Sequence, residues 1–214
     1  MQPFNTLTAI AIPLTWPDVN TDDIFPATGV NSSTMDPSAL TDRTQMGRNA
    51  FAGYRYRSDG SPNPNFIMNQ RPYVDGEVLI AGRNFGCGSS REMAVWALAQ
   101  IGVRCIIAPS FGDIFHGNAI ANGMLPVVLA PDEVETLALL ACNEPLDRLT
   151  VNLEAQTIST LHGMRFGFSI GAYHRHMLLN GLDEIAATLE RMSSITAFET
   201  AYHQERSWIL EKNR

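Results

Sequence analysis

Short apolar runs alternate with longer, helix-like segments through the middle of the chain. The runs at 77–81, 103–108 and 125–129 have the length and apolar content of buried strands. Each is followed by a segment with helical length and composition, at about 90–101, 113–122 and 132–141. Strands that alternate with helices indicate right-handed crossovers, so the pattern predicts an α/β fold with a mostly parallel core sheet flanked by helices.

The rest of the chain is organised differently. Residues 8–14 form a further strand pattern, 151–153 and 157–160 resemble a hairpin, and 166–170 alternate as on a half-buried strand. Residues 31–72 form a long polar excursion with weak periodicity, of a kind that is usually functional or forms an interface. The segment 173–212 is predicted to be a helical extension, with breaks at 180–181 and 193–194. We expect one domain over 1–214.

Composition excludes several classes of protein. Hydrophobic residues make up 45% of the 214 residues and the net charge is −7, so the chain should fold and lacks the basic surface that nucleic acid requires. No run approaches the roughly 20 apolar residues of a membrane span, and the start lacks the features of a signal peptide. These features predict a cytoplasmic protein that binds neither membrane nor nucleic acid.

The cysteines argue against a metal centre held by this chain alone. There are 3 of them, Cys87, Cys105 and Cys142, without a C-x-x-C pair. We expect Cys105 and Cys142 to be core thiols, as free cysteines usually are. Cys87 is expected to be a small residue in a tight turn, with a reactive thiolate as the alternative. All three fit a reducing compartment.

The glycine-rich stretch 83–92 carries the candidate chemistry. Ser89 and Glu92 have the spacing of a capping box, so the simplest interpretation is that Ser89 only caps a helix. However, a second serine follows it, and Arg91 would be unfavourable in the first turn of a helix unless an anion lies there. Gly88 removes a side chain from the approach, so a ligand could contact backbone. The stretch therefore predicts a site for a carboxylate.

A serine in such a site could act as a base. Its alkoxide would need stabilisation by the helix N-terminus and a neighbouring guanidinium. It could then deprotonate a carbon next to a carboxylate that an arginine holds. Asp22 and Asp23 are either acids or caps of a turn, and Arg55 is either solvated or a second carboxylate clamp. No nucleophile elbow, dinucleotide fingerprint or P-loop spacing occurs.

Several segments together resemble one family, the small subunit of 3-isopropylmalate dehydratase in the aconitase superfamily. They occur in family order over nearly the whole chain, and the Gly-Ser-Ser-Arg-Glu piece is shared across the superfamily. The matching segments are 20–26, 62–66, 84–92, 108–118, 125–127 and 180–183.

The resemblance implies a swivelling β/β/α domain and a separate large subunit, in a heterodimer or heterotetramer. That subunit would carry a [4Fe-4S] cluster whose open iron binds the substrate. By motif, Ser89 resembles the catalytic base, Ser90 the adjacent hydroxyl that supports the substrate, and Arg91 the arginine that binds its carboxylate. Asp22 matches an acidic position that organises the site, and Arg55 falls where the family's excursion carries an arginine.

One departure leaves the substrate open. The family commonly has histidine after Arg-Glu, whereas this chain has Met93, whose thioether cannot replace an imidazole hydrogen bond. The leading hypothesis is the isomerisation of 2-isopropylmalate to 3-isopropylmalate in leucine biosynthesis. The alternatives are a related hydro-lyase for citraconate/methylmalate or dimethylmalate, and a non-catalytic module that binds a dicarboxylate.

Overall fold

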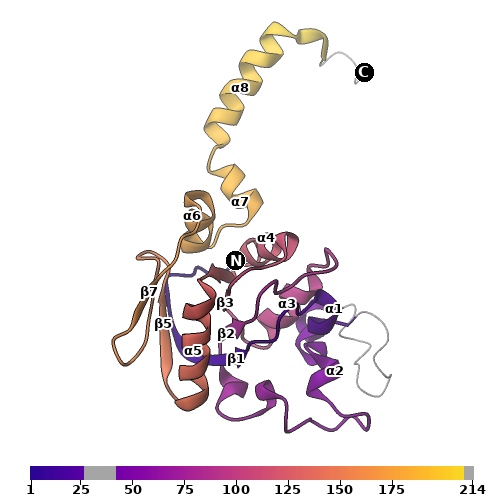
Figure 1. Cartoon of the computed structure of the whole chain (residues 1–214). Helices are drawn as coiled ribbons and strands as arrows, with labels where there is room; N and C mark the ends of the chain where they lie inside the picture. Colours follow the sequence, from indigo (N-terminus) through magenta and orange to yellow (C-terminus); the bar gives the residue numbers. More distant parts are fainter. Residues whose placement is uncertain (27–41, 210–214) are drawn as a thin grey trace.

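The computed structural model describes residues 1–26 and 42–209, and its centre is a seven-stranded sheet in the order β4-β3-β2-β1-β5-β6-β7 (Figure 1). Strands β1 to β4 pair in parallel, while β5, β6 and β7 continue the sheet antiparallel from β1. The strands are β1 (Thr6–Leu14), β2 (Val78–Ala81), β3 (Cys105–Ala108), β4 (Leu125–Val128), β5 (Arg148–Asn152), β6 (Thr157–Ser159) and β7 (Arg165–Gly167). The predicted α/β fold and its parallel core are confirmed.

Helices cover both faces of the parallel strands, which explains why β2, β3 and β4 are apolar without interruption. In β2, Leu79 and Ala81 face a core shared with α3 and α4, whereas Val78 and Ile80 face a core shared with α5. The helices of this region are α3 (Met93–Gln100), α4 (Asp113–Ala121) and α5 (Pro131–Asn143). Burial on both faces fixes the register of β2, and with it the position of the loop that follows.

The polar excursion is only partly regular. Its residues 31–41 lie outside the described part of the chain. The remainder contains short helical turns, namely η2 (Arg43–Asn49), α2 (Ala52–Arg55), η3 (Ile67–Asn69) and η4 (Tyr73–Asp75). Of these, η2 packs beside α3, α2 beside α1 (Thr21–Ile24), and η3 and η4 beside β1.

The C-terminal extension is helical, as predicted, and leads away from the sheet (Figure 1). It consists of α6 (Ala172–Asn180), α7 (Glu184–Leu189), α8 (Met192–Glu205) and the turn η5 (Ser207–Ile209). The predicted break at 180–181 is confirmed, because Gly181 ends α6 with φ of +66°. The break predicted at 193–194 is wrong, since both serines lie inside α8, which has no buried residue. Residues 210–212 of the predicted extension lie outside the described residues.

Two further expectations concern burial and membranes. Cys105 is buried in β3, and this burial raises the pKa of its thiol, so it is the expected core thiol. Cys142 is exposed, so that prediction was wrong; it lies near the end of α5 and lines an open cavity together with Pro13 and Ala81. In the described ranges, no helix is both long and apolar enough to cross a bilayer.

Gly86 is expected to be indispensable to the loop after β2. It has φ of +74°, and a Cβ there would lie 2.2 Å from the ring of Phe115. Gly102 is a matched control, because its φ is +95° but a Cβ added there would meet no atom within 4 Å. We expect Gly102→Ala to cost about 1–2 kcal/mol of unfolding free energy from backbone strain. Gly86→Ala should cost about 1–3 kcal/mol more, because the clash is added.

Urea unfolding, monitored by circular dichroism, measures the loss of unfolding free energy in both variants. Equal losses in the two variants would show that the contact between Gly86 and Phe115 does not constrain the loop.

Candidate active site

The site is built where two loops continue the parallel pairing of β1 and β2 beyond the strand ends. Asp18 N–H donates to the carbonyl of Arg83 at 2.9 Å, and Gly86 N–H donates to that of Val19 at 2.7 Å. Thr21 N–H then donates to the carbonyl of Cys87 at 2.8 Å. These bonds carry the segment after β1 alongside the glycine-rich loop, so that Thr21 and Ser89, which are 68 positions apart in the sequence, meet.

A capped single turn presents the residues that follow β1. The Asn20 Oδ1 accepts from the backbone N–H groups of Asp22 and Asp23 at 2.8 Å each, and Asp23 Oδ2 accepts from Asn20 N–H at 3.0 Å. This reciprocal cap fixes α1 (Thr21–Ile24) and confirms the predicted capping role of Asp23. The Asp22 side chain takes no part in the cap and points outward from the turn.

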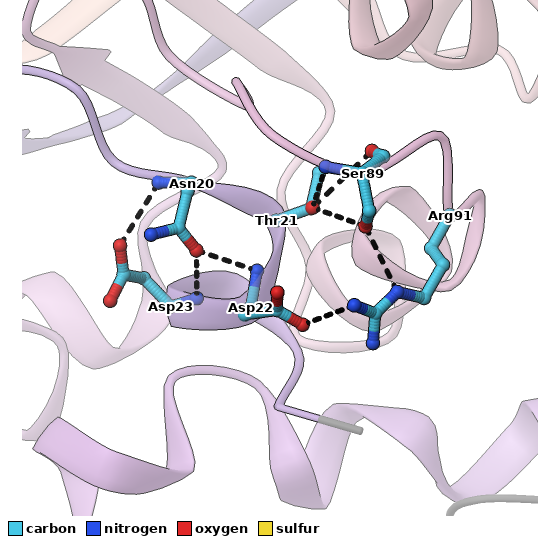
Figure 2. A network of polar contacts seen from close by, with 6 residues as sticks. All are labelled: Asn20, Thr21, Asp22, Asp23, Ser89 and Arg91. Carbon is cyan, nitrogen blue, oxygen red and sulfur yellow. Dashed lines mark hydrogen bonds and ion pairs between the residues drawn. The ribbon is translucent and has the colours of Figure 1, made fainter. Parts of the chain in front are cut away.

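Figure 2 shows the side chains of Thr21 and Arg91 converging on the Ser89 hydroxyl. Ser89 Oγ lies 2.7 Å from Thr21 Oγ1, and Arg91 Nε donates to the same Ser89 oxygen at 2.9 Å. Arg91 Nη2 also pairs with Asp22 Oδ1 at 2.6 Å. Backbone holds the arrangement, because Ser89 N–H donates to Thr21 Oγ1 at 3.1 Å. Three of the predicted residues, Ser89, Arg91 and Asp22, therefore lie together.

Thr21 is the site residue that the sequence prediction missed. It is 3% exposed, and its hydroxyl bonds to both the backbone and the side chain of Ser89. The position of Thr21 in a polar, cap-like segment was visible in the sequence. Its contact with Ser89 depends on the loop pairing, which no local pattern indicates.

This arrangement would stabilise charge on the Ser89 oxygen. A deprotonated Ser89 could accept from Arg91 Nε–H and from the Thr21 hydroxyl, so two donors already surround it. The Arg91 side chain is 34% exposed, so it remains accessible from solvent. Its contacts to Ser89 and Asp22 use two of its five N–H donors, which leaves others for a ligand carboxylate.

The glycine loop also forms the wall of an open cavity of about 420 Å³. Ser89 and Gly88 line it together with the segment from Phe111 to Phe115. Gly88 is exposed with φ of +97°, and a Cβ there would lie 3.6 Å from Thr21 Oγ1. Ser90 is exposed next to Ser89 but is not among the residues of the network in Figure 2. Both Gly88 and Ser90 are placed where a small ligand could reach them.

Arg55 lies apart from this network. It donates from Nη1 to the carbonyl of Gly47 at 3.1 Å and from Nε to Asn69 Oδ1 at 3.3 Å, which ties the excursion together. The neighbouring Tyr54 reaches the site instead, because its hydroxyl donates to Asp23 Oδ1 at 2.8 Å. Burial and the Asp23 carboxylate raise the pKa of Tyr54, so this phenol remains a donor.

The predicted capping box of Ser89 and Glu92 does not form. Helix α3 begins at Met93, and Glu92 instead accepts from Asn122 Nδ2 at 2.6 Å, at the end of α4. Ser89 is therefore not a cap and its hydroxyl is available for the network. The helix N-terminus lies beyond Ser89, so the positive charge at the hydroxyl comes from Arg91. Met93 is half-buried against the core, where its thioether packs as an apolar group.

The contacts of His116 and His176 lie outside the Ser89 network. His116 lies in α4, with its ring 5.8 Å from that of Phe111. Burial and, next, the proximity of His174 lower the pKa of His116, against a smaller opposing effect of Asp113, so it is neutral at pH 7. His174 and His176 lie in α6 at the surface, and His176 pairs with Glu190 at 2.9 Å.

The thiols do not fit an iron–sulfur cluster. Cys87 lies in the glycine loop, where its Sγ donates to the Asp18 carbonyl at 3.4 Å. Cys105 lies in β3 and Cys142 in α5, and all three cysteines of the chain are free. A cluster needs several thiolates around one centre, which these positions do not supply.

Comparisons with known proteins identify relatives of the whole chain. Residues 1–132 match the family model described as the aconitase C-terminal domain. The small subunit of 3-isopropylmalate dehydratase from Cereibacter sphaeroides is 43% identical over 98% of this chain and 100% of its own length. The protein of the same name from Methylobacterium radiotolerans is 46% identical over 97% of this chain and 100% of its own length.

A solved structure extends the likeness to the fold. The crystal structure of 3-isopropylmalate dehydratase (LeuD) from Methanocaldococcus jannaschii matches with a TM-score of 0.59 and 25% identity, over 91% of this chain and 99% of that one. The expected swivelling-domain fold of the aconitase superfamily is thus confirmed. With relatives at 43% and 46% identity over nearly its whole length, the chain belongs to the 3-isopropylmalate dehydratase small-subunit family.

Proposed function

We propose that this chain is the small subunit of a hydro-lyase that isomerises 2-isopropylmalate to 3-isopropylmalate in leucine biosynthesis. The observation that carries the proposal is the Ser89 hydroxyl, held 2.9 Å from the Arg91 guanidinium and 2.7 Å from Thr21 Oγ1 at the edge of an open cavity. The relatives named 3-isopropylmalate dehydratase small subunit, which match over their whole length, indicate the substrate class.

Ser89 acts as the base in this proposal. Its alkoxide takes the proton from the carbon next to a substrate carboxylate, and the electron pair of that C–H bond forms the C=C bond as hydroxide leaves from the neighbouring carbon. Rehydration reverses both steps with the positions of hydrogen and hydroxyl exchanged. Arg91 and Thr21 stabilise the serine oxygen while it is charged, since both are oriented toward it before the reaction.

Arg91 has a second task, which is to hold the substrate. A guanidinium binds a carboxylate through two parallel N–H donors, and Arg91 keeps donors available beyond its contacts to Ser89 and Asp22. Asp22 orients the guanidinium, while Ser90 and the backbone of Gly88, which are exposed on either side of Ser89, would contact the same ligand. Arg55 would contribute to substrate binding from the excursion. Tyr54, its neighbour in the same segment, already reaches Asp23.

The leaving hydroxyl requires a Lewis acid, and the three separated thiols of this chain do not form a cluster site. When bound, a [4Fe-4S] cluster on the large subunit would supply that chemistry. The partner is therefore a large subunit, in a heterodimer or heterotetramer, and the substrate is a small diacid. Three free thiols fit a cytoplasmic location.

Removal of the proposed base should remove most of the activity. Ser89→Ala should lower kcat by about 10²–10⁴, because the proton acceptor is lost. Turnover is measured spectroscopically on the enzyme reconstituted with its large subunit. Assembly should be unchanged by size-exclusion chromatography, since the alanine backbone preserves the N–H bond to Thr21. Wild-type turnover in an assembled Ser89→Ala enzyme would contradict the role of this residue.

A second prediction separates Arg91 from a merely structural arginine. Arg91→Lys should raise KM and lower kcat, each by about 10- to 100-fold, because lysine lacks both the Nε–H donor to Ser89 and the planar fork. Arg83→Lys is the matched control, since Arg83 lies in the same loop and pairs with Asp18 at 2.8 Å, away from Ser89. Steady-state kinetics should show no comparable change in the control; similar losses in both would argue against a carboxylate contact by Arg91.

The substrate itself is tested with a panel of hydroxy-diacids. Reconstituted enzyme should have a higher kcat/KM for 2-isopropylmalate and 3-isopropylmalate than for methylmalate, citraconate and dimethylmalate. A preference for a methylated malate would establish the related hydro-lyase instead. Binding of a diacid without turnover, in the presence of an active large subunit, would favour the non-catalytic module.

A further inference from the structure

Three side chains of metal-ligand type converge at the surface, on segments other than those that build the Ser89 site. Glu144 follows the last residue of α5, Asp147 lies in the turn before β5, and His162 lies in the turn between β6 and β7. His162 Nε2 is 3.0 Å from Asp147 Oδ2 and is hydrogen-bonded to Glu144 Oε2. The three ligand atoms all lie within 4.8 Å of one another.

Two carboxylates face one imidazole at this cluster, so negative charge is in excess. Two carboxylates lie at the C-terminal end of a 13-residue helix, where the helix dipole already disfavours negative charge. In the described part of the chain, the ion pairs of Glu144 and Asp147 are both with His162, and none is with a lysine or arginine. The imidazole offers one N–H at Nε2 to two carboxylate oxygens, so a single proton bridges a site with two negative charges.

We propose that Glu144, Asp147 and His162 bind a divalent cation of the zinc class, in place of the bridging proton. One imidazole nitrogen with two carboxylate oxygens suits Zn²⁺, which accepts both ligand types, better than Ca²⁺ or Mg²⁺, which take oxygen ligands. Water would complete a tetrahedral set.

The geometry permits this binding with small movements. Ligands about 2.0–2.1 Å from a tetrahedral zinc ion are separated from one another by about 3.3 Å. The 3.0 Å between His162 Nε2 and Asp147 Oδ2 is close to that value. The side chains of His162, Glu144 and Asp147 are 52%, 44% and 32% exposed, so they can move apart without disturbing the core.

The bound cation would join two segments that are distant in sequence. The end of α5 and the turn before β5 supply two ligands, and the β6–β7 turn supplies the third. The ligands meet only in the folded chain, so binding would stabilise the fold by mass action.

The test uses the full-length chain with any affinity tag removed, and Zn²⁺ itself as the probe. Isothermal titration calorimetry should give saturable binding to the wild type, and thermal unfolding should shift to higher temperature with Zn²⁺. His162→Gln and Asp147→Asn should each weaken binding at least about tenfold and abolish the thermal shift. All these side chains are at least partly exposed, so both variants should fold, which circular dichroism verifies.

Two controls make the outcome specific. His176→Gln removes an imidazole that pairs with one carboxylate, Glu190, and should leave Zn²⁺ binding unchanged. Cys142→Ser removes the exposed thiol nearest in sequence and should also bind as the wild type does. The proposal is overturned if the wild type shows no saturable binding tighter than about 1 mM. It is equally overturned if His162→Gln binds normally while Cys142→Ser does not.

Discussion

The candidate active site depends on a short stretch of backbone pairing that extends the β1–β2 ladder past its regular end. The N–H of Gly86 bonds the Val19 carbonyl, and the N–H of Thr21 bonds the Cys87 carbonyl. Because β2 is buried on both faces and the paired half of β1 contributes to both cores, their register cannot shift without moving apolar side chains out of two cores. The rigidity of the sheet thereby reaches the loop, and Ser89 is held against Thr21 by main-chain geometry.

Charge is the second constraint on the site. Helix α3 begins too late to place its positive end at Ser89, so the guanidinium of Arg91 supplies the field at the hydroxyl. Asp22 holds that guanidinium from the other side, on a turn whose own cap uses Asn20 and Asp23. Asp23 therefore fixes the turn, and Asp22 orients the arginine. Glu92, which would compete for the serine in a capping box, is instead bonded to Asn122.

The surface cluster of Glu144, Asp147 and His162, like the Ser89 site, is assembled from segments that are separate in the sequence. Its two carboxylates come from the end of one helix and the following turn, and its imidazole comes from a hairpin turn. The sequence does not show this site by its spacing. The third ligand, His162, lies in another turn and is brought to Glu144 and Asp147 by the antiparallel extension of the sheet. A site assembled from separate turns is therefore recognised only in the folded structure, because no single residue stands out in its local sequence.

Periodicity by itself determined the alternation of strands and helices, since a strand buried on two faces must be apolar throughout and the residues show this directly. The order of motifs also determined the family, and residue type made Ser89, Arg91 and Asp22 candidates. Tertiary structure decided what those residues contact. It replaced the predicted Ser89–Glu92 cap by the Thr21 contact, turned the Arg55 side chain to Gly47 and Asn69, and left Cys142 exposed in an open cavity near the end of α5. The physical reason is that capping and burial depend on competing partners, such as Asn122 for Glu92, and a local pattern holds no information about partners that the fold brings from elsewhere.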